Sequence, residues 1–173
     1  MVWIYSNLCT SILIITASRW NFANFQSPTY SAVIMEFVTP SSCGSTTVRV
    51  SGIVTDDKIL FANTQTGHVK HTETVADAVN DWPEPSSASY KWEGKTEDGK
   101  EVSALLEGSL GPRLDRVDIM GEIPAIVKSF VATAAGTKPY IYQFGPKPTL
   151  EITVGDETKK EEGKLFAEAT FIS

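Results

Sequence analysis

The feature that most constrains the fold is a series of short β-type segments, separated by turn signals at near-regular spacing. Residues 30–38 (YSAVIMEFV) are strongly β-forming, and residues 46–55 alternate at Val48 and Val50 around a charged residue. The Asp98-Gly99 pair is a strong hairpin signal between two further segments. About eight to ten such strands close most easily as an antiparallel, lipocalin-like β-barrel, which has room for one small ligand. We therefore predict an all-β fold.

The individual strands follow from the same pattern. Residues 21–29 read as a connection, and residues 67–81 are ambiguous. Pro83 and Pro85 argue against a central strand there, because proline has no N–H to donate to a ladder. The last two strands form a predicted hairpin over a charged loop at 155–163. We predict strands at residues 11–20, 30–38, 46–55, 58–63, 89–94, 101–110, 114–120, 138–144, 149–154 and 164–172.

One helix interrupts this pattern, at about residues 124–135. Pro124 suits the first helical turn, and Glu122 lies near the positive end of the helix dipole. Ile126 and Phe130 are an i,i+4 apolar pair, and Gly136 favours a left-handed end. We expect this helix to close one end of the barrel, beside the aromatic strand that follows it.

Length and charge limit the class of protein. The 173 residues support one domain spanning residues 1–173, and a net charge of −6 argues against a nucleic-acid partner. The apolar N-terminus has no preceding Lys or Arg and its apolar run is too short to cross a bilayer, so we interpret it as structure, with no signal peptide and no membrane span. Cys9 and Cys43 have no metal-site spacing, which favours free thiols in a reducing compartment and a cytoplasmic location; a disulfide between them is the alternative.

The common catalytic motifs are missing. His68 and His71 are the only histidines, and we interpret them as exposed residues near a loop because no metal-site pattern accompanies them. The sequence has no GxSxG elbow and no nucleotide-binding glycine motif, so we expect neither metal nor cofactor. Asp115, Asp118 and Glu122 read as turn and cap carboxylates rather than a catalytic pair.

Aromatic side chains and one lysine are the remaining candidates for a site. Lys138 precedes a proline that holds its backbone extended, and it adjoins two tyrosines. It is either a solvated strand-end lysine or a fixed cation that holds the acidic or carbonyl head group of a ligand. The aromatic residues either fill the core or line a large apolar pocket of the kind that binds small molecules. The candidates for that pocket are Trp3, Tyr5, Trp20, Tyr30, Tyr140 and Tyr142.

Several segments resemble the C-terminal domain of the fungal Diels–Alderases, the pericyclases that form decalin rings in polyketide pathways. The resemblance is carried by residues 115–124 (DRVDIMGEIP) and 130–143 (FVATAAGTKPYIYQ), with support from residues 48–61 and 166–172. It implies a lipocalin-like barrel that normally pairs with an N-terminal β domain, which this chain would lack. By position, Lys138 matches the pocket lysine that polarises the substrate carbonyl, Trp3 matches a pocket tryptophan, and Tyr140 and Tyr142 line the same wall.

The resemblance also implies a function. A stereoselective intramolecular [4+2] cycloaddition of a linear polyene polyketide or polyketide–amino acid intermediate needs an apolar pocket that aligns the reacting ends and one polar group on the carbonyl. We therefore expect a cyclase of secondary metabolite biosynthesis that binds an apolar polyene. One alternative is a non-catalytic, lipocalin-like carrier of an apolar molecule. The other is a polyene hydratase or isomerase, which would need Asp115, Asp118 or Glu122 to point inward. An apolar flank would be covered by a second copy or a partner domain.

Overall fold

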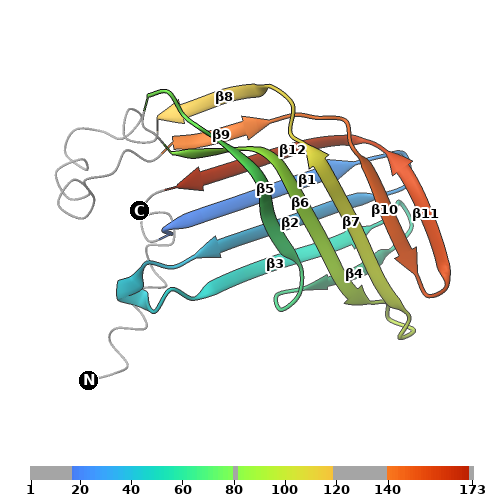
Figure 1. The fold of residues 1–173 in the computed structure, drawn as a ribbon. Coiled ribbons are helices and arrows are strands. Elements are labelled where there is room, and N and C mark those ends of the chain that lie inside the picture. The colour runs from blue at the N-terminus through green and yellow to red at the C-terminus, as the bar shows by residue number, and fades with distance from the viewer. Residues whose placement is uncertain (1–16, 80–81, 119–139, 172–173) are drawn as a thin grey trace, which may run out of the picture.

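The computed structural model describes residues 17–79, 82–118 and 140–171, which form twelve β-strands and one short 3-10 turn, η1 (Ser41–Cys43). Figure 1 shows the strands in two layers that cross at an angle. The strands are β1 (Arg19–Gln26), β2 (Ser31–Val38), β3 (Thr47–Val54), β4 (Ile59–Asn63), β5 (His68–Ala76), β6 (Pro83–Lys95), β7 (Glu101–Ser109), β8 (Arg113–Asp118), β9 (Tyr140–Phe144), β10 (Thr149–Val154), β11 (Glu157–Glu162) and β12 (Lys164–Phe171).

The two layers are antiparallel sheets. The seven-stranded sheet has the order β4-β3-β2-β1-β12-β9-β8, and the five-stranded sheet has the order β11-β10-β7-β6-β5. The predicted all-β, lipocalin-like fold is confirmed. Among the described residues, the two sheets are not joined into one closed hydrogen-bonded barrel, and the strands outnumber the eight to ten that we predicted.

The space between the sheets is filled by side chains that alternate along the strands. On β7, Val102, Ala104 and Leu106 are buried while the residues between them are exposed. Trp92 of β6 is completely buried, and its indole Nε1–H donates to the Val33 carbonyl oxygen of β2 at 2.9 Å, which links the two sheets. The largest fully buried side chains are Trp92, Tyr142, Phe25, Phe144, Ile34, Ile53, Leu150 and Ile152.

The first strand lies later in the sequence than we predicted. We expected a strand at 11–20 and a connection at 21–29, but β1 runs from Arg19 to Gln26. Its inward face is Asn21, Ala23 and Phe25, so the residues that we took for a loop alternate into the core. Residues 11–16 lie outside the described part.

The end of the chain also differs from the prediction. The expected charged loop at 155–163 contains β11, the hairpin partner of β10. All of its side chains are charged or polar, which is common on an edge strand because charge blocks pairing with other chains. Strand β12 is not the partner of β10; it pairs with β1 and β9 in the other sheet.

The ambiguous and proline-containing segments form one irregular hairpin. Strand β5 pairs with β6 with register shifts after His71 and Glu73. Pro83 and Pro85 belong to β6 but have only β5 as a neighbour, because pairing with β7 starts at Ser87. The prolines thus lie where the strand is an edge on one side, as their missing N–H groups require.

Three other expectations depend on undescribed residues or on context. The predicted helix at 124–135 lies outside the described residues, as does Cys9. Cys43 is disulfide-bonded, so the prediction of a free thiol there is wrong. The single domain and the cytoplasmic location stay predictions.

Candidate functional site

The predicted site residues do not form one pocket in the described part of the chain. Tyr30 packs in the core just before β2, whereas Tyr140 lies level with Val38 at the other end of that strand. Tyr140 and Tyr142 are both buried, and Trp20 is half-buried on the outer face of β1. Trp3, Tyr5 and Lys138 lie outside the described residues. The binding roles of all these residues, and the catalytic role of Lys138, stay predictions.

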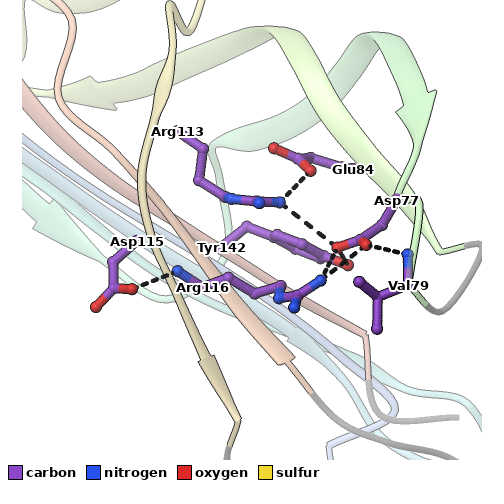
Figure 2. Close-up of polar contacts among 7 residues, drawn as sticks. All are labelled: Asp77, Val79, Glu84, Arg113, Asp115, Arg116 and Tyr142. Atoms are coloured by element: carbon purple, nitrogen blue, oxygen red, sulfur yellow. Dashed lines mark hydrogen bonds and ion pairs between the residues drawn. The ribbon is translucent and has the colours of Figure 1, made fainter.

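Tyr142 belongs to a buried polar cluster that connects the two sheets (Figure 2). Asp77, directly after β5, receives hydrogen bonds from Arg116 Nη1 at 2.8 and 2.9 Å and from the Tyr142 hydroxyl at 3.0 Å. The backbone N–H of Val79 donates to the same carboxylate at 2.8 Å. Arg113 pairs with Glu84 of β6 and lies 3.5 Å from Asp77. Both arginines come from β8, so the cluster joins the β5–β6 end of one sheet to the β8–β9 edge of the other.

The arginines of this cluster also stack on the tyrosines of β9. The Arg116 guanidinium lies 4.8 Å from the Tyr140 ring centre, and the Arg113 guanidinium lies 5.7 Å from the Tyr142 ring centre. Such cation–π contacts add to the ion pairs and orient both rings. Tyr140 and Tyr142 are therefore held by this cluster and do not line an open cavity.

The cluster keeps Asp77 ionised. Burial raises the pKa of the Asp77 carboxyl, but the Val79 N–H, the Arg116 guanidinium and the Tyr142 hydroxyl outweigh burial and hold the pKa below its usual value. A carboxyl with a lowered pKa is a poor general acid at neutral pH. Asp115 and Asp118 are exposed, and Glu122 lies outside the described residues. The inward-pointing acid that a polyene hydratase needs is thus not provided by Asp115 or Asp118.

A second polar group lies where β5 crosses the inner face of the seven-stranded sheet (Figure 1). Asn21, Glu36 and Arg49 are direct cross-strand neighbours on β1, β2 and β3. Arg49 Nε donates to Glu36 at 2.8 Å, and His71 Nε2 of β5 lies 2.8 Å from Asn21 Oδ1. The expectation of two exposed histidines is wrong for His71, which is half-buried; burial, with Arg19 nearby, lowers its pKa to about 4. His71 is therefore neutral at neutral pH.

The outer face of the seven-stranded sheet is unusually apolar. Val33, Val50 and Val54 are 39%, 44% and 36% exposed, and Ile59 of the edge strand is 66% exposed. Soluble monomers rarely expose a continuous apolar patch of this kind unless it binds something. The apolar side chains that alternate onto this face of β1, β2, β3 and β12 are Trp20, Phe22, Val33, Met35, Phe37, Val48, Val50, Val54 and Phe166.

The apolar face contains a hollow of about 320 Å³. Gly52 and Ala62, which are paired on β3 and β4, form its floor because they have little or no side chain. A Cβ atom at Gly52 would lie 3.0 Å from the Phe61 carbonyl oxygen, so a larger residue does not fit easily there. Val33, Val50, Val54 and Ile59 form the walls. The size falls at the lower end of the range for small-molecule sites.

Trp20 places an unsatisfied donor on the same face. Its indole Nε1 is buried and has no hydrogen-bond partner, the one such side-chain atom found in the part of the chain that the structure describes. A buried donor without a partner costs free energy, and a ligand acceptor can recover that cost. Trp20 lies four residues from Asn24, which borders the hollow, or about 13 Å along β1.

We used the sequence around these features without recognising the outer face or the ion cluster. Residues 31–38 (SAVIMEFV) are apolar at both alternating positions, which is typical of a strand that is covered on both faces. That signal could have identified the outer face. Asp77 gave no comparable signal, because its partner Arg116 is 39 residues away in the sequence. The apolar flank that we expected is present, and its coverage by a second copy or a partner domain stays a prediction.

Two further searches gave negative results within residues 17–79, 82–118 and 140–171. No three or more His, Cys, Asp or Glu side chains are grouped so that they could hold a metal ion. No helix in these ranges is long and apolar enough to cross a membrane.

Comparison with known proteins gives consistent relatives. The model of the Svf1 family matches residues 14–173. The ceramide-binding proteins svf1 of Emericella nidulans and svf-1 of Neurospora crassa are each 54% identical to this chain over 91% of its length. The Schizosaccharomyces pombe protein of the same name is 41% identical, again over 91%. The matches cover 42% of each of these three relatives, so the chain spans about two-fifths of their length.

Solved structures share the fold at low sequence identity. CghA in complex with Sch210972 aligns with a TM-score of 0.57 at 11% identity, over 91% of this chain and 42% of CghA. Kievitone hydratase from Nectria haematococca aligns with a TM-score of 0.50 at 14% identity, over 90% of this chain and 40% of the hydratase. At these identities the similarity supports the fold alone.

These relatives correct the predicted function. The assignment to the Diels–Alderase family is wrong, because the family model and relatives at 41–54% identity point to another family. The predicted cyclase activity, and with it a role in polyketide or decalin biosynthesis, is wrong for the same reason: the relatives are named as binding proteins and not as enzymes. The alternative of a non-catalytic carrier of an apolar molecule agrees better with these names.

Proposed function

The chain belongs to the Svf1 family, and we propose that it binds a lipid of the ceramide class without changing the lipid covalently. The observation that carries this proposal is the 54% identity, over 91% of this chain, to a protein named as ceramide-binding. Because the chain spans 42% of that relative, the ligand of the whole relative is transferred here only as a proposal.

We place the lipid on the apolar outer face of β1–β4. A hydrocarbon chain gains about 0.8 kcal/mol for each CH₂ group removed from water, so a patch of exposed valines is a favourable surface for it. The hollow of about 320 Å³ above Gly52 and Ala62 accommodates a segment of one chain, and the flanking residues Val33 and Val50 extend the contact. The interior supports the proposal less well, because Trp92, Tyr142 and Phe25 fill it.

The polar part of the ligand has a matching group at the end of this face. A ceramide carries an amide and hydroxyl groups, and both provide hydrogen-bond acceptors. The buried Nε1–H of Trp20 has no partner among the described residues and can donate to such an acceptor. A single neutral donor on an apolar surface favours an uncharged head group over a charged one.

The proposal predicts which substitutions weaken binding. Val50→Asp places a carboxylate against the hydrocarbon chain, and we expect at least a tenfold loss of affinity, or about 1.4 kcal/mol, because a charge in contact with an acyl chain loses hydration. Ala62→Phe fills the hollow without adding charge and is expected to have a similar effect. The measurement is a titration of the purified 173-residue chain with fluorescent ceramide, with competition by unlabelled ceramide and by phosphatidylcholine.

Val75→Asp is the matched control, because Val75 is 60% exposed and lies on β5 of the other sheet. It should bind like the original chain. If Val50→Asp and Ala62→Phe also bind like the original chain, the lipid does not use the outer face. If the folded original chain shows no binding that ceramide displaces, the proposed function is wrong for this chain.

A further inference from the structure

The polar hollow under β5 has not been used by the lipid site. It has a volume of about 290 Å³ and lies between β5 and the inner face of β1, β2 and β3. It is therefore on the opposite face of the seven-stranded sheet from the apolar hollow. Arg19, Arg49 and Lys70 line it, together with Glu36 and the two histidines.

The charges around this hollow are not balanced. Three cations surround a single carboxylate, Glu36, in a chain whose net charge is −6. The side chains of Arg19 and Lys70 have no hydrogen-bond or ion-pair partner in the described part of the chain, unlike Arg49, which binds Glu36. His71 is neutral at neutral pH and adds no charge. Three cations this close repel one another, and a bound anion would relieve the repulsion.

The geometry of the donors suits an oxyanion. Arg49 contacts Glu36 through Nε, which leaves the two terminal nitrogens of its guanidinium outside that contact. Guanidinium groups bind phosphate oxygens with paired hydrogen bonds, and lysine adds a point charge. Asn21 accepts from His71 through Oδ1, so its amide nitrogen is a further donor on the wall of the hollow.

We propose that the hollow lined by Arg19, Arg49 and Lys70 binds a phosphate group, either as a free anion or as the head group of an anionic lipid. This proposal does not depend on the ceramide site, since it uses different residues on the other face of the sheet. Glu36 lowers the affinity by repulsion while it holds Arg49 in position. The site is consequently expected to be weaker than one made of cations alone.

The test compares two double variants that remove the same charge. Arg19→Gln/Lys70→Gln removes two cations of the hollow, and Lys147→Gln/Lys159→Gln removes two exposed lysines elsewhere. The first readout is thermal stabilisation by inorganic phosphate against sodium chloride at equal ionic strength. The second is co-sedimentation with phosphatidylcholine vesicles that contain phosphatidic acid. Loss of the first pair is expected to weaken binding about tenfold, and loss of the second pair to leave it unchanged.

A third variant gives a change of the opposite sign. Glu36→Gln removes the repulsive carboxylate, so phosphate binding is expected to become tighter, by about threefold or more. A merely structural role for the cluster would not predict a gain. Stabilisation by phosphate alone supports a free anion, and an effect seen only with vesicles supports a lipid head group. The proposal is overturned if neither probe binds, or if both double variants lose binding equally, since that would show general charge attraction.

Discussion

Trp92→Ala is expected to lower the free energy of unfolding by about 3–5 kcal/mol, the largest loss that we expect from a single substitution in this chain. Trp92 is completely buried between the sheets, so its removal leaves a cavity that the surrounding side chains fill only partly. The substitution also deletes the hydrogen bond from Nε1 to the Val33 carbonyl oxygen. Urea unfolding followed by circular dichroism measures the change.

Trp92→Phe separates the two contributions. Phenylalanine keeps most of the apolar contact and loses the hydrogen bond, so we expect a smaller loss, about 1–2 kcal/mol. Val33 also forms a wall of the apolar hollow, and Trp92→Ala should therefore weaken ceramide binding beyond its effect on stability. An alanine variant that loses less than about 1 kcal/mol would contradict the packing described for the interior.

Asp77→Asn is expected to lower the free energy of unfolding by about 2–4 kcal/mol, because it leaves two arginines next to a buried, uncharged amide. The carboxylate accepts from Arg116, Tyr142 and the Val79 backbone, and asparagine can replace only part of these contacts. The measurement is again urea unfolding, at neutral pH. Asp156→Asn, at an exposed turn, is the control and should change stability little.

The effect of Asp77 should depend on pH with a definite sign. Its pKa is lowered in the folded state, so the unfolded chain takes up a proton first as the pH falls. The stabilisation is therefore complete above the ordinary aspartate pKa, about 3.9, and is lost as the pH falls through the lower folded-state value. An unchanged difference between the original chain and Asp77→Asn across this range would contradict the described hydrogen bonds.

Local sequence patterns predicted most strands but not their partners. The Asp98-Gly99 hairpin and the paired strands β2 and β3 follow from turn chemistry and alternation, which act within a few residues. The pairing of β12 with β1 joins residues that are far apart, and no local period encodes it. The shift of β1 has a similar cause: its apolar residues also suit a loop until β2 and β12 pair with it on both sides.

The candidate site was harder to predict than the fold. The aromatic residues that we grouped by type are separated in space, with Tyr142 in an ion cluster and Trp20 on the outer face. The resemblance to the Diels–Alderases agreed with the lipocalin-like architecture and misled on function, because one architecture supports different activities through different sites. An apolar pocket without catalytic motifs is also what a lipid carrier needs, so the composition could not separate the two.

The most direct test of the central claim is to map where a photoactivatable ceramide crosslinks to the chain. With the photoreactive group on the acyl chain, we expect the adducts at residues that border the outer hollow, above all Val33, Val50 and Ile59. An excess of unlabelled ceramide should remove them, and Val50→Asp should reduce them. Adducts confined to the five-stranded sheet, or equal labelling in the presence of excess ceramide, would show that the outer face of β1–β4 is not the lipid site.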